Sequence, residues 1–211
     1  MPKLNQGIHQ LKVTLKESKP PIWRQFQVPS DITLHRLHLI LQEVMGWTNS
    51  HLYRFEIGGA EYGEPDPEYA DHGIDMRNAR RIKLNQVVSS EKMRFTYEYD
   101  FGDGWGHQVL VEKILPADPH AQYPVCIAGK QACPPENCGG IWGYAELLKI
   151  IRDPLHEEHQ SMMVWLGGSF DPKAFDIDQV NRSLRHFRQS SKSRRPDVPE
   201  VFRRAFESED Q

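Results

Sequence analysis

Apolar and polar residues alternate along two short stretches near the start of the chain. The first covers residues 11–15 and the second covers residues 22–28, and a turn that contains one serine and two prolines separates them. A period of two residues is typical of a strand with one buried face. The pattern therefore predicts an N-terminal antiparallel pair of strands.

A helical period follows this pair. Apolar residues recur at three- and four-residue spacing over residues 34–45, which is the spacing of an apolar stripe on an α-helix. Thr33 precedes the stripe as a candidate N-cap, and Gly46 follows it as a candidate C-terminal cap. Alternation returns over residues 53–57, so the predicted order is strand, strand, helix, strand.

Residues 93–115 have the pattern of a β-hairpin. Alternating residues up to position 99 and β-prone residues from position 108 flank a turn that contains three glycines. We expect the hairpin to gather several side chains close together at its tip. These are Asp100, Asp103, Trp105 and His107.

The rest of the chain predicts irregular segments followed by helices. Residues 60–82 and 116–141 lack any period and are interrupted by prolines and glycines. Helical periodicity returns within residues 147–187, where Asp176 is a candidate N-cap for the last helix.

These elements predict an α+β fold. We expect a mainly antiparallel sheet, one helix after the first two strands, and a helical C-terminal third. The opening order of elements is compatible with a β-grasp-like core, as an analogy of topology. Residues 1–188 are expected to form a single domain, and the polar residues 189–211 a flexible C-terminal tail.

Composition narrows the class of protein. Of the 211 residues, 38% are hydrophobic and 26% are charged, and no window approaches the ~20 apolar residues that cross a bilayer. The first ten residues lack the apolar core of a secretory signal, which predicts a cytoplasmic protein with no membrane partner. The formal net charge of −3 gives no overall attraction to nucleic acid.

The hairpin tip is the first candidate site. Asp100, Asp103 and His107 could supply oxygen and nitrogen ligands to a divalent metal, or a general base with an orienting carboxylate. The alternative is structural, because aspartate in a glycine-rich turn commonly hydrogen-bonds the backbone. The sequence leaves both interpretations open.

The cysteines are the second candidate site. Cys126, Cys133 and Cys138 fall within thirteen residues, and three thiolates with one histidine would complete a tetrahedral zinc site. Conceivable fourth ligands are His107, His156 and His159. The spacing is unconventional for structural zinc, and the alternative is that the thiols pack as small hydrophobic groups.

One dense basic run lies near the C-terminus. Such a run can bind the phosphates of nucleic acid, although it is more often a solvated helix face whose charge nearby acids offset. Its candidate nucleic-acid contacts are Arg182, Arg185, Arg188, Arg194 and Arg195.

Several segments together resemble one known family. The N-terminal residues 8–59 and the segments YEYDFGDGWGHQVLVEKIL, PVCIAGKQACPPENCGGIWGYAELL and WLGGSFDPKAFD are similar to the plasmid pRiA4b ORF-3-like family. The resemblance spans about residues 8–188. It implies a protein carried on plasmids or as a passenger of insertion elements, and the family carries a resolvase-like label. Resolvase activity is not supported, because the N-terminus has no serine before Ser18 to act as the nucleophile.

The function predicted from these observations is that of a binding or accessory module rather than an enzyme, with an unknown protein or nucleic-acid partner. The chain contains no P-loop, nucleophile elbow or dinucleotide fingerprint. One alternative is a metal-dependent hydrolase acting on phosphodiesters through the hairpin tip. The other is a structural domain stabilised by zinc at the cysteines.

Overall fold

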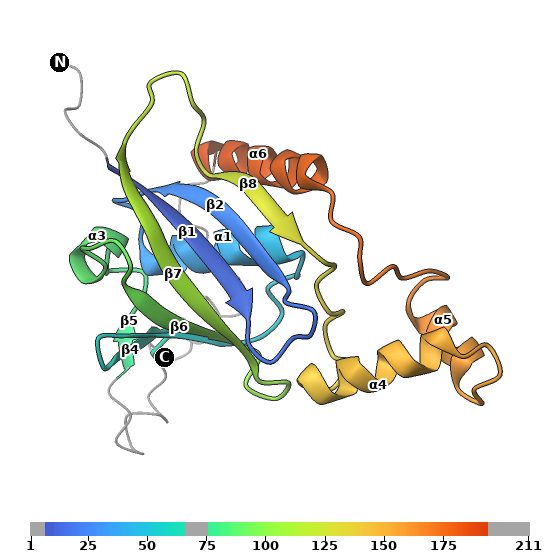
Figure 1. The fold of residues 1–211 in the computed structure, drawn as a ribbon. Helices are drawn as coiled ribbons and strands as arrows, with labels where there is room; N and C mark the ends of the chain where they lie inside the picture. The colour runs from blue at the N-terminus through green and yellow to red at the C-terminus, as the bar shows by residue number, and fades with distance from the viewer. Residues whose placement is uncertain (1–6, 66–75, 194–211) are drawn as a thin grey trace, which may run out of the picture.

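A computed structural model describes residues 7–65 and 76–193 of the chain. Eight strands form one sheet with the order β5-β4-β3-β6-β7-β1-β2-β8 (Figure 1). The strands are β1 Gly7–Leu15, β2 Trp23–Pro29, β3 Tyr53–Ile57, β4 Ala60–Gly63, β5 Met76–Asn78, β6 Arg94–Tyr99, β7 Trp105–Pro116 and β8 Val125–Lys130. The helices are α1 Leu34–Met45, α3 Leu84–Val87, α4 Gly140–Arg152, α5 His159–Trp165 and α6 Ile177–Ser193.

The sheet is mainly antiparallel, as the sequence predicts. The long strands β1 and β7 pair at its centre, from Gly7 opposite Pro116 to Leu15 opposite His107. Within the described residues, the pairing of β4 with β5 is the one parallel pair. Because β1 pairs antiparallel with both its neighbours, the β-grasp comparison extends no further than the order of the first elements.

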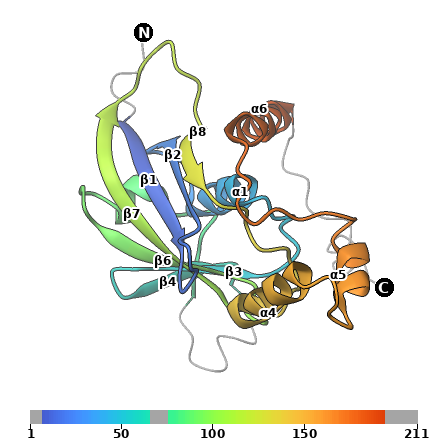
Figure 2. The ribbon, with the colours of Figure 1, turned by 45° about the vertical axis from the view of Figure 1, so that its right-hand side comes forward.

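Helix α1 covers one face of the sheet and begins and ends where the sequence predicts. The Thr33 hydroxyl accepts a hydrogen bond from the Arg36 amide, and Gly46 closes the helix with a left-handed φ of 91°. Its buried leucines and isoleucine join the core formed by the inner side chains of the strands. Helix α6 packs beside α1 and β8 (Figures 1 and 2).

The structure places strands inside both segments that the sequence predicts to be irregular. Within residues 60–82 it forms β4 and β5, and within residues 116–141 it forms the edge strand β8. Strand β8 alternates poorly between buried and exposed residues, and a bulge interrupts its pairing with β2. An edge strand with one neighbour and little buried surface leaves a weak period in the sequence, which explains the error.

Three of the described helices lie in the C-terminal part of the chain. Asp176 caps α6 as predicted, because its Oδ1 accepts hydrogen bonds from the amides of Asp178 and Gln179 at 2.9 and 3.0 Å. The backbone of α6 continues to Ser193, so residues 189–193, which the sequence assigns to a tail, belong to a helix. The rest of the predicted tail lies outside the described residues. No helix in the described ranges combines the length and apolar character needed to cross a membrane.

Candidate functional site

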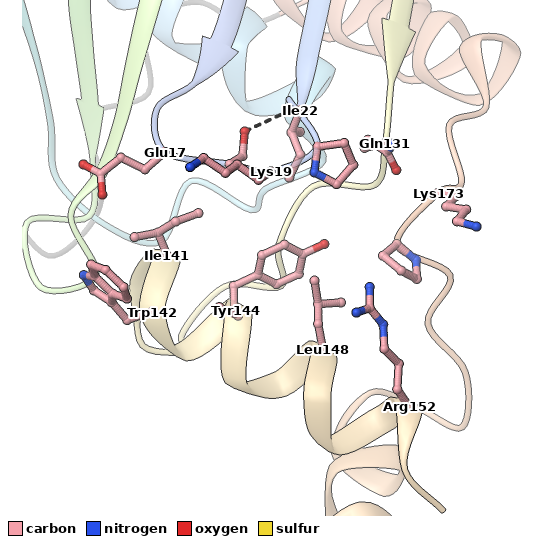
Figure 3. Close-up of a pocket in the computed structure, with 14 residues that line it drawn as sticks. Glu17, Lys19, Ile22, Gln131, Ile141, Trp142, Tyr144, Leu148, Arg152 and Lys173 are labelled. Atoms are coloured by element: carbon pink, nitrogen blue, oxygen red, sulfur yellow. Dashed lines mark hydrogen bonds between the residues drawn. The ribbon is translucent and has the colours of Figure 1, made fainter.

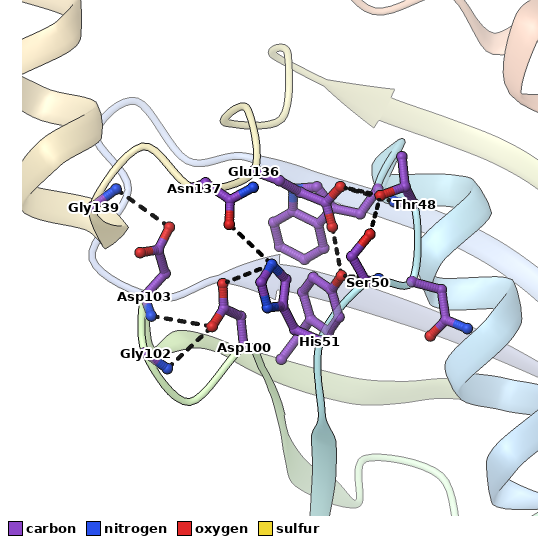
Figure 4. Close-up of polar contacts among 12 residues, drawn as sticks. Thr48, Ser50, His51, Asp100, Gly102, Asp103, Glu136, Asn137 and Gly139 are labelled. Atoms are coloured by element: carbon purple, nitrogen blue, oxygen red, sulfur yellow. Dashed lines mark hydrogen bonds and ion pairs between the residues drawn. The ribbon is translucent and has the colours of Figure 1, made fainter. Parts of the chain in front are cut away.

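The hairpin between β6 and β7 uses its first aspartate to fold the turn. The Oδ1 atom of Asp100 accepts hydrogen bonds from the backbone amides of Gly102 at 3.1 Å and Asp103 at 3.3 Å (Figure 4). Asp100 itself has a positive φ of 56°, a conformation that aspartate tolerates better than most residues. This carboxylate oxygen therefore has the structural role that the sequence analysis set beside the metal-ligand role.

The hairpin tip also binds two neighbouring segments (Figure 4). The second oxygen of Asp100 lies 3.5 Å from Nε2 of His51, and the same nitrogen lies 3.0 Å from Oδ1 of Asn137. Asp103 accepts a hydrogen bond from the Gly139 amide at 3.3 Å. The tip and the cysteine-containing segment thus lie together and contact each other.

A second polar link joins the same segments (Figure 4). The Glu136 carboxylate accepts hydrogen bonds from the hydroxyls of Tyr99 and Thr48, and from the Thr48 amide at 3.2 Å. Burial and the hydrogen bond to Glu136 raise the pKa of Tyr99 well above its usual value. The tyrosine therefore stays protonated and acts as a hydrogen-bond donor. These bonds hold residues 136–139 against the end of the sheet.

Trp105 and His107 are not at the surface of the tip. Their exposed fractions are 1% and 0%, and their rings lie 5.8 and 5.3 Å from the ring of Trp47 in the core. Both occupy inward positions of β7, in phase with the buried Val109 and Val111. The predicted surface group of a histidine and two aspartates is therefore wrong. The period of β7 already indicated this, because every second residue from Trp105 to Val111 faces the core.

His107 is held in its neutral form. Burial lowers its pKa to about 4, and its Nδ1 lies 3.3 Å from the carbonyl oxygen of Tyr97. The other ring nitrogen, Nε2, and the indole nitrogen of Trp105 are buried without a hydrogen-bond partner among the described residues. In the described part of the chain, no group of three His, Cys, Asp or Glu side chains is arranged to hold a metal ion.

The cysteines pack as the alternative interpretation suggested. Cys126 is buried on β8, where its thiol donates to the carbonyl oxygens of Gln25 and Ala128 at 3.5 and 3.6 Å. Cys133 and Cys138 are partly buried against the core. Burial raises the pKa of Cys126 to about 11 and that of Cys138 to about 12, and it raises the pKa of Cys133 further. Among the described residues, the three cysteines are not part of any group of three His, Cys, Asp or Glu side chains that could hold a metal ion.

The basic run lies partly outside the described residues. Arg188 donates hydrogen bonds to the carbonyl oxygens of Gln122 and Pro124 at 3.0 and 2.9 Å, which ties α6 to the segment before β8. Arg182 lies 3.7 Å from Asp176, and Arg185 is exposed. The predicted contacts Arg194 and Arg195 fall in residues 194–211, which the structure does not describe.

A pocket of about 450 Å³ lies beside α4 (Figure 3). Four segments line it: the β1–β2 turn at residues 17–22, Gln131 after β8, one face of α4, and residues 172–173. Its volume lies within the range of about 300–1,000 Å³ that is typical of small-molecule sites. None of its residues was singled out from the sequence, because the pocket exists only where the fold brings these separate segments together.

The walls of the pocket are fixed by local hydrogen bonds. The Ser18 hydroxyl donates to the Leu15 carbonyl at 2.8 Å and accepts from the Ile22 amide at 3.0 Å, which shapes the β1–β2 turn. The Ala132 amide donates to the Pro172 carbonyl at 3.0 Å and holds the last segment in place. The hairpin tip also helps to position the wall that α4 forms, because Asp103 contacts the start of this helix.

Two largely buried residues line the pocket with polar atoms that remain open to it and have no hydrogen bond to any other described residue. They are Tyr144, which is 5% exposed, and Gln131, which is 8% exposed. Tyr144, Leu148 and Arg152 project from α4 into the space below Ile22 and Gln131 (Figure 3). Burial raises the pKa of Tyr144 to about 12, so its hydroxyl keeps its proton. Unpaired polar groups in an apolar pocket are typical of a site that orients a ligand.

Comparison with known proteins gives consistent results. The model of the family described as Plasmid pRiA4b ORF-3-like protein matches residues 7–179. The uncharacterized protein y4hQ of Sinorhizobium fredii (strain NBRC 101917 / NGR234) is 42% identical over 180 residues, covering 84% of this chain and 91% of the relative. A crystal structure of a protein of unknown function, MM3350 from Methanosarcina mazei Go1, superimposes with a TM-score of 0.73 at 37% identity, covering 82% of this chain and 96% of that chain.

Proposed function

The chain belongs to the plasmid pRiA4b ORF-3-like protein family, and we propose that it is a binding module that receives a small organic molecule in the pocket beside α4. In this proposal it is an accessory protein of plasmids or other mobile elements and not an enzyme. The ligand binds by burial of its apolar body and by hydrogen bonds to the polar side chains of the wall.

One observation carries this proposal. Four separate segments line the pocket, and the hydroxyl of Tyr144 and the amide of Gln131 face it without a hydrogen bond to another described residue. A ligand in this pocket can bury an apolar body against the lining and hydrogen-bond to the hydroxyl and the amide, which have no partner among the described residues.

The two alternative functions have weaker support. A metal-dependent hydrolase acting on phosphodiesters needs a ligand group at the hairpin tip, but His107 faces the core and Asp100 bonds the turn. A zinc-stabilised domain needs several ligands around one ion, but no group of three His, Cys, Asp or Glu side chains in the described part of the chain could hold one. The binding module is therefore the function that these residues favour.

Filling the pocket tests the proposal. Ala145 lies on the exposed surface of α4 and lines the pocket, so Ala145→Trp should occupy the pocket without burying new polar groups. We expect the wild-type chain to bind para-toluamide, a neutral aromatic probe, in a titration followed by NMR chemical shifts. The variant should bind it at least about tenfold more weakly, because the buried contact area is lost.

The matched control is Ala121→Trp. Ala121 is exposed in the segment between β7 and β8, away from α4, so this change should leave the affinity unaltered. If the wild-type chain binds neither para-toluamide nor its carboxylate analogue para-toluate, or if Ala145→Trp binds with unchanged affinity, the proposed function is contradicted.

A further inference from the structure

The charged groups that line the pocket are unevenly divided between the two signs. Three of the lining side chains are cations and one is an acid. The cations are Lys19, Arg152 and Lys173, and the acid is Glu17. The formal charge of the chain is negative, so this excess of positive charge is local to the pocket and does not reflect the overall composition.

Arg152 is the cation best placed to contact a ligand. It is the last residue of α4, and its side chain extends beside Leu148 toward the interior of the pocket (Figure 3). It forms no ion pair with another described residue. An arginine at the end of a helix is favourable in itself because it faces the last carbonyl groups. The interaction with the helix C-terminus does not explain why the Arg152 guanidinium is directed into the pocket.

Two uncharged polar side chains of the wall can also donate hydrogen bonds to a ligand that Arg152 contacts. Tyr144 offers a hydroxyl that remains protonated, and Gln131 offers an amide group. Guanidinium, hydroxyl and amide donors around one space can together satisfy the two oxygens of a carboxylate, which accepts several hydrogen bonds when ionised.

The apolar part of the wall limits which anions fit. Ile22, Ile141 and Leu148 form this part of the surface, and Trp142, which is 80% exposed, stands at its edge. Highly charged inorganic anions would lose hydration against these side chains without gaining contacts. An anion with an apolar body would bury that body and keep its charged end near the cations.

From these observations we propose that the pocket selects organic carboxylates that carry a compact apolar or aromatic body, with Arg152 pairing with the carboxylate. This inference rests on the proposed function, because it names the class of ligand for the same pocket. Tyr144 and Gln131 orient the carboxylate, and the apolar wall receives the rest of the molecule.

The test compares two probes of nearly the same shape, para-toluate and para-toluamide. Near pH 7 and at low salt, para-toluate should bind the wild-type chain about tenfold more tightly than the amide, because hydrogen bonds to an ionised acceptor are the stronger ones. Arg152→Leu should remove most of that difference by weakening para-toluate, while the affinity for para-toluamide stays nearly constant. Arg185→Leu, at an exposed position on α6, is the control and should change neither affinity.

The outcomes separate this inference from the proposed function. If both probes bind with equal affinity and Ala145→Trp weakens both, the pocket is a ligand site but does not select carboxylates, and the inference fails alone. If para-toluate is preferred but Arg152→Leu does not reduce the preference, the assignment of Arg152 is overturned. If neither probe binds, the inference and the proposed function fail together.

Discussion

Acidification from pH 6.5 to pH 4 should remove roughly 6 kcal/mol from the free energy of unfolding through two buried histidines. Burial lowers the pKa of His38 to about 3 and that of His107 to about 4. A depressed pKa in the folded state stabilises the protein above the unfolded value of about 6.5, and this contribution is lost as the pH falls toward the folded value. Each histidine accounts for about 3 kcal/mol of the change by pH 4.

The surroundings of His38 explain why it resists protonation. Its Nε2 faces the Asn49 side-chain oxygen at 2.5 Å, and its Nδ1 lies 2.8 Å from the Tyr97 hydroxyl. The Tyr97 hydroxyl also accepts from the Gln42 amide at 2.9 Å, so it donates to Nδ1 of a neutral imidazole. A proton on Nδ1 would turn that hydrogen bond into a conflict between two donors inside the core.

His107 resists protonation for a simpler reason. Its Nε2 has no partner among the described residues, so a proton there would place an unsatisfied charge in a fully buried site. The loss expected from the two histidines is comparable to the whole stability of an ordinary domain, which is about 5–15 kcal/mol. The protein should therefore unfold or lose its packing as the pH approaches 4.

Urea unfolding at several pH values between 7.5 and 4 measures this effect. His107→Leu removes one of the two titrating groups, so its free energy of unfolding should fall less steeply with decreasing pH than that of the wild type, by about one proton per molecule. The comparison cancels the carboxylates, which are the same in both proteins. Parallel curves for the two proteins would show that His107 does not contribute to acid unfolding.

The sequence predicts elements whose signals are local. Helix α1 has an apolar stripe, the N-cap Thr33 and the C-terminal Gly46 in adjacent positions, and the structure confirms each of them. Strand β8 has little local signal because its position depends on β2 and α6, which lie far away in the sequence. Elements stabilised mainly by distant partners are those that sequence patterns miss.

The candidate site also has a part that local sequence patterns predict and a part that depends on residues far apart in the sequence. The hairpin was predicted correctly, but nearness in the sequence suggested that His107 would join Asp100 and Asp103, whereas the alternation of β7 directs it into the core. The pocket depends on Gln131, Tyr144 and Arg152 facing a turn more than one hundred residues earlier in the chain. No pattern within a single segment carries that information.

The junction between the hairpin tip and α4 should be highly sensitive to one methyl group. A Cβ atom at Gly140 would lie 2.3 Å from the backbone oxygen of Asp103, and Gly140 has a positive φ of 67°. Gly140→Ala should therefore destabilise the protein by about 3–4 kcal/mol, as the sum of left-handed backbone strain and a backbone clash. Because α4 lines the pocket, the affinity for para-toluate should fall together with stability.

Gly139→Ala is the matched control for this change. Gly139 also has a positive φ, of 86°, but a Cβ atom there would meet its nearest neighbour at an ordinary 3.5 Å. Its cost should be the backbone strain alone, about 1–2 kcal/mol. Urea unfolding of the two variants separates the contributions. Equal losses of stability would mean that the structure accommodates a Cβ atom at Gly140, and that the close approach of Asp103 does not constrain the start of α4.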